Sequence, residues 1–502
     1  MRWVLMLSAV LGLGLAWWLY PADFLWPQAG GPWRPVGDAA QHAVAQRYFL
    51  ASPWQWPPLD VALLGGLNLA FMDGIPLLAL PLKLAAALLP PGFHGIGLWY
   101  ALCWVALPVS AAWAMRGTGE TRSGPLLAVA LAAMSMPAFI MRFGHAALCG
   151  HFLLWLALGL YLRLVAGRRL WPAAAGLQVA ALLVHPYLAV MTLAVLAAVP
   201  LTLACRGTAA RRAMLGLAAA LGFMLLVMAG FGYLGASGDG QRFYGAFAMN
   251  LFSPFWPFRS WFLGAGIAAE IDATGHGGWE GYNWLGLGLW LAIALLVILR
   301  PRAVLAGLAA HGGLVLACLG LTALAITHRV GLGSASIELF PAPGFLEQFR
   351  ASGRFFWPVG AALLLGAAAL LARQGRAGVA LLALCAVIQF IDAVPARQAL
   401  HDWARTAQPW RVDAAALRPL LARAERVVLL PAWPCIAADD HAAREALLEM
   451  LALASETPRP INTMYAARWP GGPPPCLPPG PPERGELRLE WEGGWRVTAT
   501  PR

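Results

Sequence analysis

Repeated apolar segments constrain this chain more than any other feature. The 502 residues are 60% hydrophobic and only 12% charged, whereas soluble domains carry about a quarter charged residues. A helix needs about 20 apolar residues to cross the roughly 30 Å hydrocarbon core of a bilayer. About eleven runs approach this length and predict membrane spans: 3–20, 96–115, 124–141, 146–166, 171–184, 187–204, 211–234, 285–300, 303–326, 356–373 and 377–394.

The distribution of charge predicts how the spans are oriented. The net charge is +11, but the basic residues lie in short loops between apolar runs, which favours membrane topology over nucleic-acid binding. Cytoplasmic loops are enriched in Arg and Lys. We therefore expect the short Arg-rich loops and the N-terminus in the cytoplasm, and the long loops 21–95, 235–284 and 327–355 outside. The first run lacks a clear cleavage site and should remain as a span.

Part of the first outer loop is itself apolar. Residues 60–90 must begin and end outside, so we expect a re-entrant hairpin or a pair of interfacial helices there. Asn68 and Asp73 would be the polar points of this segment.

A second irregular segment is the apolar run 171–204, which is interrupted at His185-Pro186-Tyr187. It predicts two helices that meet at the outer side. The first of them extends only about 21 Å at 1.5 Å per residue. The break should therefore lie below the outer surface, in a cavity, because irregular backbone at that depth needs protein or water around it.

Residues 395–502 are polar enough to form a small extracytoplasmic α/β domain behind a membrane domain of residues 1–394. Cys435 and Cys476 lie in this tail and would form a disulfide if the tail is outside the cytoplasm. The predicted fold is an all-α polytopic membrane bundle with interfacial or re-entrant helices in its first outer loop and this C-terminal domain. The expected elements of the tail are a strand at 426–431, a helix at 441–455 and a hairpin at 485–500.

Two acidic residues in the first outer loop are the leading candidates for chemistry. Asp38 follows the first span at the edge of the lipid, where a carboxylate can accept a proton or bind a divalent metal. Alternatively, Asp38 is a helix N-cap. His42 lies four residues later, on the same helical face. Asp73 lies in an apolar segment, where an acid is costly and indicates function, or it caps the helix that follows.

Other polar residues lie near the outer ends of the spans. Arg142 violates the charge rule, so either a phosphate or a neighbouring carboxylate must account for it. His185, at the helix break, either packs in the core or binds substrate. A Gly- and Trp-rich loop that ends near Glu280 suits a substrate lid or an interfacial anchor. Arg354 either extends to headgroups or binds a lipid phosphate. The remaining candidates for substrate binding are His145, Tyr187 and Tyr282.

These features resemble the C-type membrane glycosyltransferase superfamily, which has a cytoplasmic N-terminus and acidic residues in a long first outer loop. The chain resembles more closely an uncharacterised bacterial family of integral membrane proteins, over most of residues 30–480. The motifs that carry this resemblance are Asp38-Ala39-Ala40-Gln41-His42, Ser52-Pro53-Trp54-Gln55-Trp56-Pro57, Asp73-Gly74-Ile75-Pro76, Gly144-His145, His185-Pro186-Tyr187, Tyr282-Asn283 and Ser352-Gly353-Arg354-Phe355-Phe356.

The superfamily resemblance implies transfer of a sugar from a polyprenyl-phosphate donor to a hydroxyl of a glycan, protein or lipid. The reaction would occur at the outer face of the bacterial cytoplasmic (inner) membrane. Asp38 would be the catalytic base, and Asp73 would assist it or hold a metal. The candidates for binding the lipid phosphate would be Arg142, His145, His185 and Arg354.

Three points stay open at this stage. We expect none of the Asp-x-Asp or Glu-x-Asp pairs in which the superfamily's second outer-loop acid often lies, which leaves a divalent metal (Mg²⁺ or Mn²⁺) undecided. A transporter or flippase for a lipid-linked sugar is the main alternative to an enzyme. A scaffold for envelope assembly is another. Membrane lipids are expected contacts in every case, and nucleic acid in none.

Overall fold

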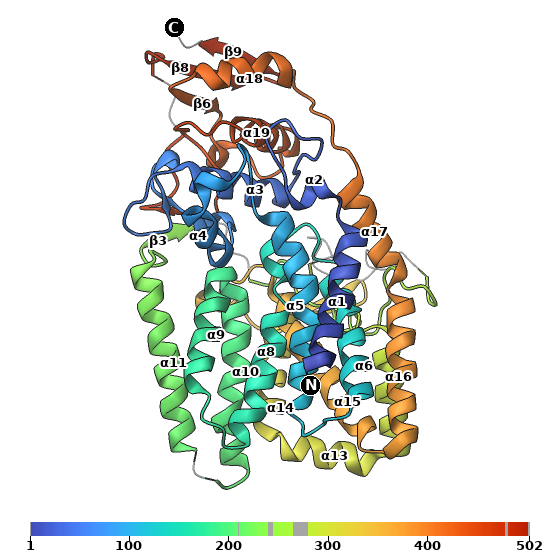
Figure 1. The fold of residues 1–502 in the computed structure, drawn as a ribbon. Helices are drawn as coiled ribbons and strands as arrows, with labels where there is room; N and C mark the ends of the chain where they lie inside the picture. The colour runs from blue at the N-terminus through green and yellow to red at the C-terminus, as the bar shows by residue number, and fades with distance from the viewer. Residues whose placement is uncertain (1, 209, 239–243, 265–279, 477–479, 500–502) are drawn as a thin grey trace.

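The computed structural model describes residues 2–208, 210–238, 244–264, 280–476 and 480–499. They form a helical bundle with the C-terminal region covering one end (Figure 1). Within the described residues, seven helices are long and apolar enough to cross a bilayer, so the chain is a multi-pass membrane protein. They are α1 (Arg2–Leu19), α5 (Ile96–Arg116), η4 with α8 (Ala146–Val165), α10 (Pro186–Cys205), α11 (Arg211–Gly230), η7 with α15 (Ser352–Ala372) and α16 (Gly375–Asp392).

Shorter helices account for the remaining apolar runs. The predicted single span at 303–326 is wrong, because its residues are divided between α13 and α14. Pro301 begins α13. Proline is favoured at the first position of a helix, because the N–H that it lacks would have no hydrogen-bond partner within the helix there. The chain bends by 106° between α12 and α13, and α13 runs across one end of the bundle (Figure 1). The shorter helices are α6 (Ser123–Met134), α7 (Pro137–Ile140), α9 (Trp171–Val184), α12 (Leu287–Leu299), α13 (Pro301–Ala310) and α14 (Gly312–Ile326).

The Arg-rich loops gather at the end of the bundle opposite the C-terminal region (Figure 1). Arg122 Nη2 donates to the carbonyl oxygen of Ala372, and Arg300 Nε donates to Oε1 of Gln374. These contacts join the loop after α5 and the turn before α13 to the turn between α15 and α16. The bundle therefore has one basic end and one end that carries the first long loop.

Close helix packing fixes where that first long loop starts. A side chain at Gly12 of α1 would collide with the backbone carbonyl of Trp104 in α5. A side chain at Gly97 of α5 would likewise collide with the carbonyl of Phe24 in α2 (Ala22–Leu25). Small residues allow membrane helices to approach closely. The segment that leads to Asp38 is therefore fixed against α5.

The first loop continues as α3 (Asp38–Ala51) and a series of short elements. Asn68 accepts from the backbone N–H of Ala70 (3.0 Å) and donates to the carbonyl of Phe231 (2.8 Å). The prediction of paired helices in 60–90 is wrong in detail, because α4 is the one α-helix within it. The elements are β1 (Asp60–Val61), η1 (Ala62–Leu64), β2 (Leu67–Asn68), η2 (Leu69–Met72), α4 (Pro76–Leu84) and η3 (Ala86–Leu88).

The tail confirms the predicted strand, helix and hairpin. Strand β6 pairs in parallel with β8, and β8 pairs antiparallel with β9. A disulfide joins Cys435 to Cys476. Strand β7 pairs with β3 of the loop after α11, so the tail is tied to the bundle. The elements are α17 (Val394–Arg405), α18 (Ala414–Arg423), β6 (Arg426–Leu430), η8 (Trp433–Cys435), α19 (His441–Ala454), β7 (Arg468–Pro470), β8 (Glu486–Trp491), β9 (Trp495–Ala499) and β3 (Ala236–Gly238).

Candidate functional site

Asp38 is the first residue of α3, at the end of the bundle that the tail covers. The N-cap position belongs to Gly37, whose φ of 55° suits glycine, and no side chain caps the helix. The capping alternative for Asp38 is therefore wrong. Instead, Asp38 Oδ2 lies 2.9 Å from His145 Nε2, and 34% of the Asp38 side chain is exposed. Asp38 thus forms an ion pair that solvent or a ligand can reach.

Asp73 lies nearby, at the end of η2. Its own φ is 53°, as is that of Ile75, and Ile75 is the N-cap residue of α4. A β-branched residue in this left-handed region is strained, and such strain concentrates at functional sites. The Asp73 carboxylate lies 3.5 Å from His185 Nε2 and 3.9 Å from His42 Nε2. The prediction that Asp73 caps the following helix is therefore wrong.

Glu280 connects Asp38 to two arginines. Its Oε2 lies 2.8 Å from Arg142 Nη1 and 2.8 Å from Arg354 Nη2, and its Oε1 lies 3.3 Å from His145 Nε2. Glu280 and both guanidinium groups are buried. Of the two explanations for Arg142, pairing with a carboxylate is thus the one observed. Arg354 is paired in the same way rather than extended to headgroups.

The Gly- and Trp-rich loop that ends near Glu280, expected to be a substrate lid or an interfacial anchor, is described only in part. Glu280, Tyr282 and Asn283 are buried, so this end of the loop belongs to the core. Residues 265–279 lie outside the described residues.

The ion pairs set the charge of the cluster. Burial lowers the pKa of His145, but the charges and hydrogen bonds of Asp38 and Glu280 outweigh it and raise that pKa to about 9. Burial raises the pKa of Asp38, but His145 outweighs it and the net shift is downward. Burial also raises the pKa of Glu280, and Arg354 and Arg142 reverse this to hold it well below its usual range. At neutral pH, His145 is therefore a cation beside two ionised carboxylates.

Asp73 has the opposite electrostatic character. Burial raises its pKa to about 6, with His145 and Arg354 opposing this shift. Burial lowers the pKa of His42 to about 3 and that of His185 well below its usual value. Asp73 is consequently a carboxylate that titrates near neutrality beside two uncharged imidazoles. A pKa close to the operating pH is what efficient proton transfer requires.

The two candidate tyrosines differ in their relation to this cluster. The hydroxyl of Tyr187 accepts from the backbone N–H of Ala351 (3.0 Å), and its ring lies under the Arg354 guanidinium at 5.3 Å. The hydroxyl of Tyr282 donates to the carbonyl of Phe258 (3.0 Å). Tyr187 therefore supports the cluster directly, whereas the polar group of Tyr282 is engaged elsewhere.

The tail contributes contacts that the sequence analysis missed. Gln41 Nε2, one turn after Asp38, donates to the carbonyl of Tyr465 (3.1 Å). The backbone N–H of Ala467 donates to the carbonyl of Phe71 (2.8 Å), two residues before Asp73. No motif in the sequence around 461–467 signals these contacts, because they join segments about 400 residues apart.

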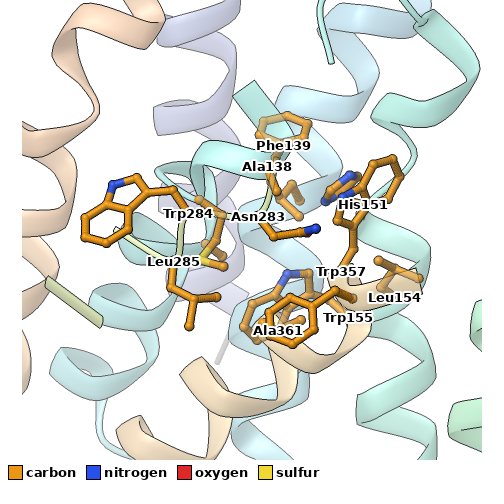
Figure 2. A pocket seen from close by; sticks show the side chains of 15 residues that line it. Ala138, Phe139, His151, Leu154, Trp155, Asn283, Trp284, Leu285, Trp357 and Ala361 are labelled. Carbon is orange, nitrogen blue, oxygen red and sulfur yellow. The ribbon is translucent and has the colours of Figure 1, made fainter. Parts of the chain in front are cut away.

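A small cavity lies inside the bundle between His151, Asn283 and Trp357 (Figure 2). His151 packs on Trp357 with ring centroids 4.5 Å apart. The cavity volume is about 20 Å³, enough for one water molecule but not for a sugar ring. Asp38, Asp73 and His145 do not line this cavity; their side chains are partly exposed, at 34%, 26% and 24%, and are therefore accessible to a ligand.

The described residues contain no group of three or more His, Cys, Asp or Glu that could hold a metal ion. The sequence does contain one acidic pair that the sequence analysis overlooked, Glu270-Ile271-Asp272. This pair lies outside the described residues. The question of a divalent metal is therefore not decided by the described residues.

Two family models match the chain. One, described as a domain of unknown function (DUF6311), matches residues 9–394, and the other, the DUF6311 C-terminal domain, matches residues 416–476. The first match ends where the sequence analysis placed the domain boundary, and neither description names an activity. No curated protein matches the chain. Because the first model covers well over half of its length, the chain belongs to the DUF6311 family.

Proposed function

We propose that this protein is an integral membrane glycosyltransferase that moves a sugar from a polyprenyl-phosphate donor to an acceptor hydroxyl. One observation carries the proposal. Two partly exposed carboxylates, Asp38 and Asp73, lie in a single cluster with the histidine cation His145. Asp38 begins α3, which lies at the end of the membrane bundle that carries the first long loop (Figure 1).

The proposed topology places this cluster outside the cytoplasm. The basic end of the bundle would face the cytoplasm, following the positive-inside tendency. The seven long helices, the bent pair α12–α13 and three shorter apolar helices would together make eleven crossings. An odd number puts the N-terminus inside and the tail outside. The Cys435–Cys476 disulfide supports this assignment, because disulfides persist in oxidising compartments.

The proposed reaction is a single displacement at the sugar carbon. The acceptor oxygen forms a bond to that carbon while the bond to the phosphate oxygen breaks. The phosphate leaves with the electron pair, and Asp38 takes the hydroxyl proton, which later passes to solvent. The low pKa of Asp38 is compatible with this role, because the hydroxyl becomes strongly acidic once its oxygen bonds to carbon. Asp73 would bind a sugar or acceptor hydroxyl.

The leaving phosphate needs positive charge that is not already neutralised. Arg142 and Arg354 share Glu280, so in our proposal they fix Glu280 and, through it, His145. Arg350 is exposed, and in the described part of the chain no carboxylate is paired with it. Its guanidinium lies 5.4 Å from the ring centre of Phe247. We therefore assign contact with the phosphate to Arg350.

The test is release of polyprenyl phosphate by protein in lipid nanodiscs, measured by mass spectrometry. Synthetic polyprenyl-phosphate monosaccharides serve as donors, with inner-membrane extract as the source of acceptors. We expect Asp38→Asn to lower the release at least 100-fold while the melting temperature shows a folded protein. Asp23→Asn changes an exposed acid of the same loop and should keep the wild-type rate. Equal release by Asp38→Asn and the wild type would refute the role of Asp38.

The pH profile separates the two carboxylates. If Asp38 is the base, the rate should stay level as the pH falls from 8 through 6, because its pKa is lowered. If Asp73 is the base, the rate should fall as the pH drops through about 6. Movement of the intact donor across vesicle membranes without cleavage would instead favour the transporter.

A further inference from the structure

Residues 461–467 contact the first outer loop at three points. The backbone N–H of Ile461 donates to the carbonyl of Leu63 (3.0 Å). Further along, Tyr465 accepts from Gln41 and Ala467 donates to Phe71. Two of these bonds attach the segment close to the acidic residues in the chain, three residues after Asp38 and two residues before Asp73. Tyr465, which accepts the bond from Gln41, is a partly exposed aromatic residue of this segment.

The ring of Tyr465 is held in a preformed stack. It lies on the indole of Trp433, with centroids 4.1 Å apart and planes 24° apart. The backbone N–H of Trp433 donates to Thr463 Oγ1 (2.7 Å). The guanidinium of Arg444 packs over the indole at 5.1 Å, and its Nε donates to a backbone carbonyl. Trp433 is buried, whereas Tyr465 is partly exposed.

The charges of both acidic residues act on the side chain of Tyr465, in addition to the hydrogen bonds that its segment makes with the first outer loop. Burial raises the pKa of the Tyr465 hydroxyl, and the charges of Asp38 and Asp73 raise it further, whereas Arg350 and Arg444 oppose them. The hydroxyl is therefore protonated at neutral pH. Within the described residues, the aromatic contact of Tyr465 is the one with Trp433.

We propose that Tyr465, backed by Trp433, is the surface on which a pyranose ring of the substrate stacks. The C–H groups on one face of a pyranose form an apolar patch that packs on an aromatic face, whose π cloud is electron-rich. The hydroxyl groups at the edge of the same sugar would then donate to Asp38 and Asp73. This inference rests on the proposed function, because it names the sugar subsite of that reaction. An uncharged ring suits a sugar rather than its phosphate.

Binding is tested separately from transfer. Saturation-transfer NMR is recorded on the full chain in nanodiscs with methyl α-pyranosides of glucose, mannose and galactose. We expect saturation of the ring C–H protons by the wild type and by Tyr465→Phe. Tyr465→Leu, which preserves an apolar side chain, should lose at least five-fold of the signal. Trp495→Ala removes a partly exposed ring from β9, which β8 separates from β6 in the three-stranded sheet, and should leave the signal unchanged.

Two outcomes would overturn the inference: an undiminished signal in Tyr465→Leu, or no saturation of any of the three pyranosides by the wild type. The result is independent of the transfer assay. The proposed reaction fails if the wild type releases no polyprenyl phosphate. The sugar subsite would still stand if saturation in the same preparation depends on Tyr465 and persists in Asp38→Asn. Release without Tyr465-dependent saturation would do the reverse.

Discussion

Asp38 and Asp73 should affect stability in opposite directions. Burial raises the pKa of Asp73 from 3.8 to about 6, so the folded state holds its proton more tightly than the unfolded state does. The ionised form therefore costs stability. This cost is absent below pH 3.8 and grows as the pH rises through about 6. The difference of about two pKa units corresponds to about 3 kcal/mol at pH 8, and to about half of that at pH 5.

Asp73→Asn removes this cost because the amide cannot ionise. We expect the variant to melt several degrees above the wild type at pH 8 and to lose about half of that advantage at pH 5. The measurement is intrinsic tryptophan fluorescence during heating, in the same detergent at both pH values. Such a gain in stability with a loss of activity is typical of residues kept for function.

Asp38→Asn is the matched control. The folded state lowers the pKa of Asp38 through His145, so the ionised carboxylate contributes stability above pH 3.8. That contribution needs His145 to be protonated and is lost as the pH rises through about 9. Asp38→Asn should therefore melt below the wild type at pH 8. If Asp73→Asn melts as low as Asp38→Asn at pH 8, the electrostatic reasoning is wrong.

Three further predictions concern the surroundings of the cluster. Glu280→Gln leaves two buried guanidinium groups uncompensated, a change that costs about 3–5 kcal/mol of stability. Its melting temperature should therefore fall well below that of the control Glu338→Gln, which alters an exposed acid. Cys435→Ser with Cys476→Ser opens a bridge between residues 41 positions apart, worth about 4 kcal/mol in the loop-entropy estimate; equal melting of this variant and the wild type would contradict a stabilising role. Arg350→Gln should raise KM for the donor about ten-fold with little change in kcat, and Arg350→Lys should restore most of the affinity; an unchanged KM would exclude the phosphate contact.

Local sequence patterns predicted those features that depend on neighbouring residues. The break at His185 follows from proline at the start of α10. The strand, helix and hairpin of the tail follow from alternation and periodicity. The split of 303–326 was missed because its apolar composition continues through two helices. Hydropathy cannot detect a change of helix direction.

The pairing within the cluster could not be predicted in the same way. Arg142 and Glu280 are 138 residues apart, and Gln41 and Tyr465 are 424 apart. The anomalous position of Arg142 correctly signalled a partner, but nothing local distinguishes a carboxylate from a phosphate. Which acid faces which base depends on helix packing over the whole bundle.

The contacts from Gln41 and Phe71 to residues 465–467 have a consequence for biosynthesis. A ribosome adds residues 465–467 only after the described membrane helices have been made. A nascent chain therefore contains Asp38 and Asp73 long before it contains the residues that bond to Gln41 and Phe71. Chains released early would insert into the bilayer yet lack these bonds. The contacts beside Asp38 and Asp73 therefore form only after these membrane helices have been synthesised.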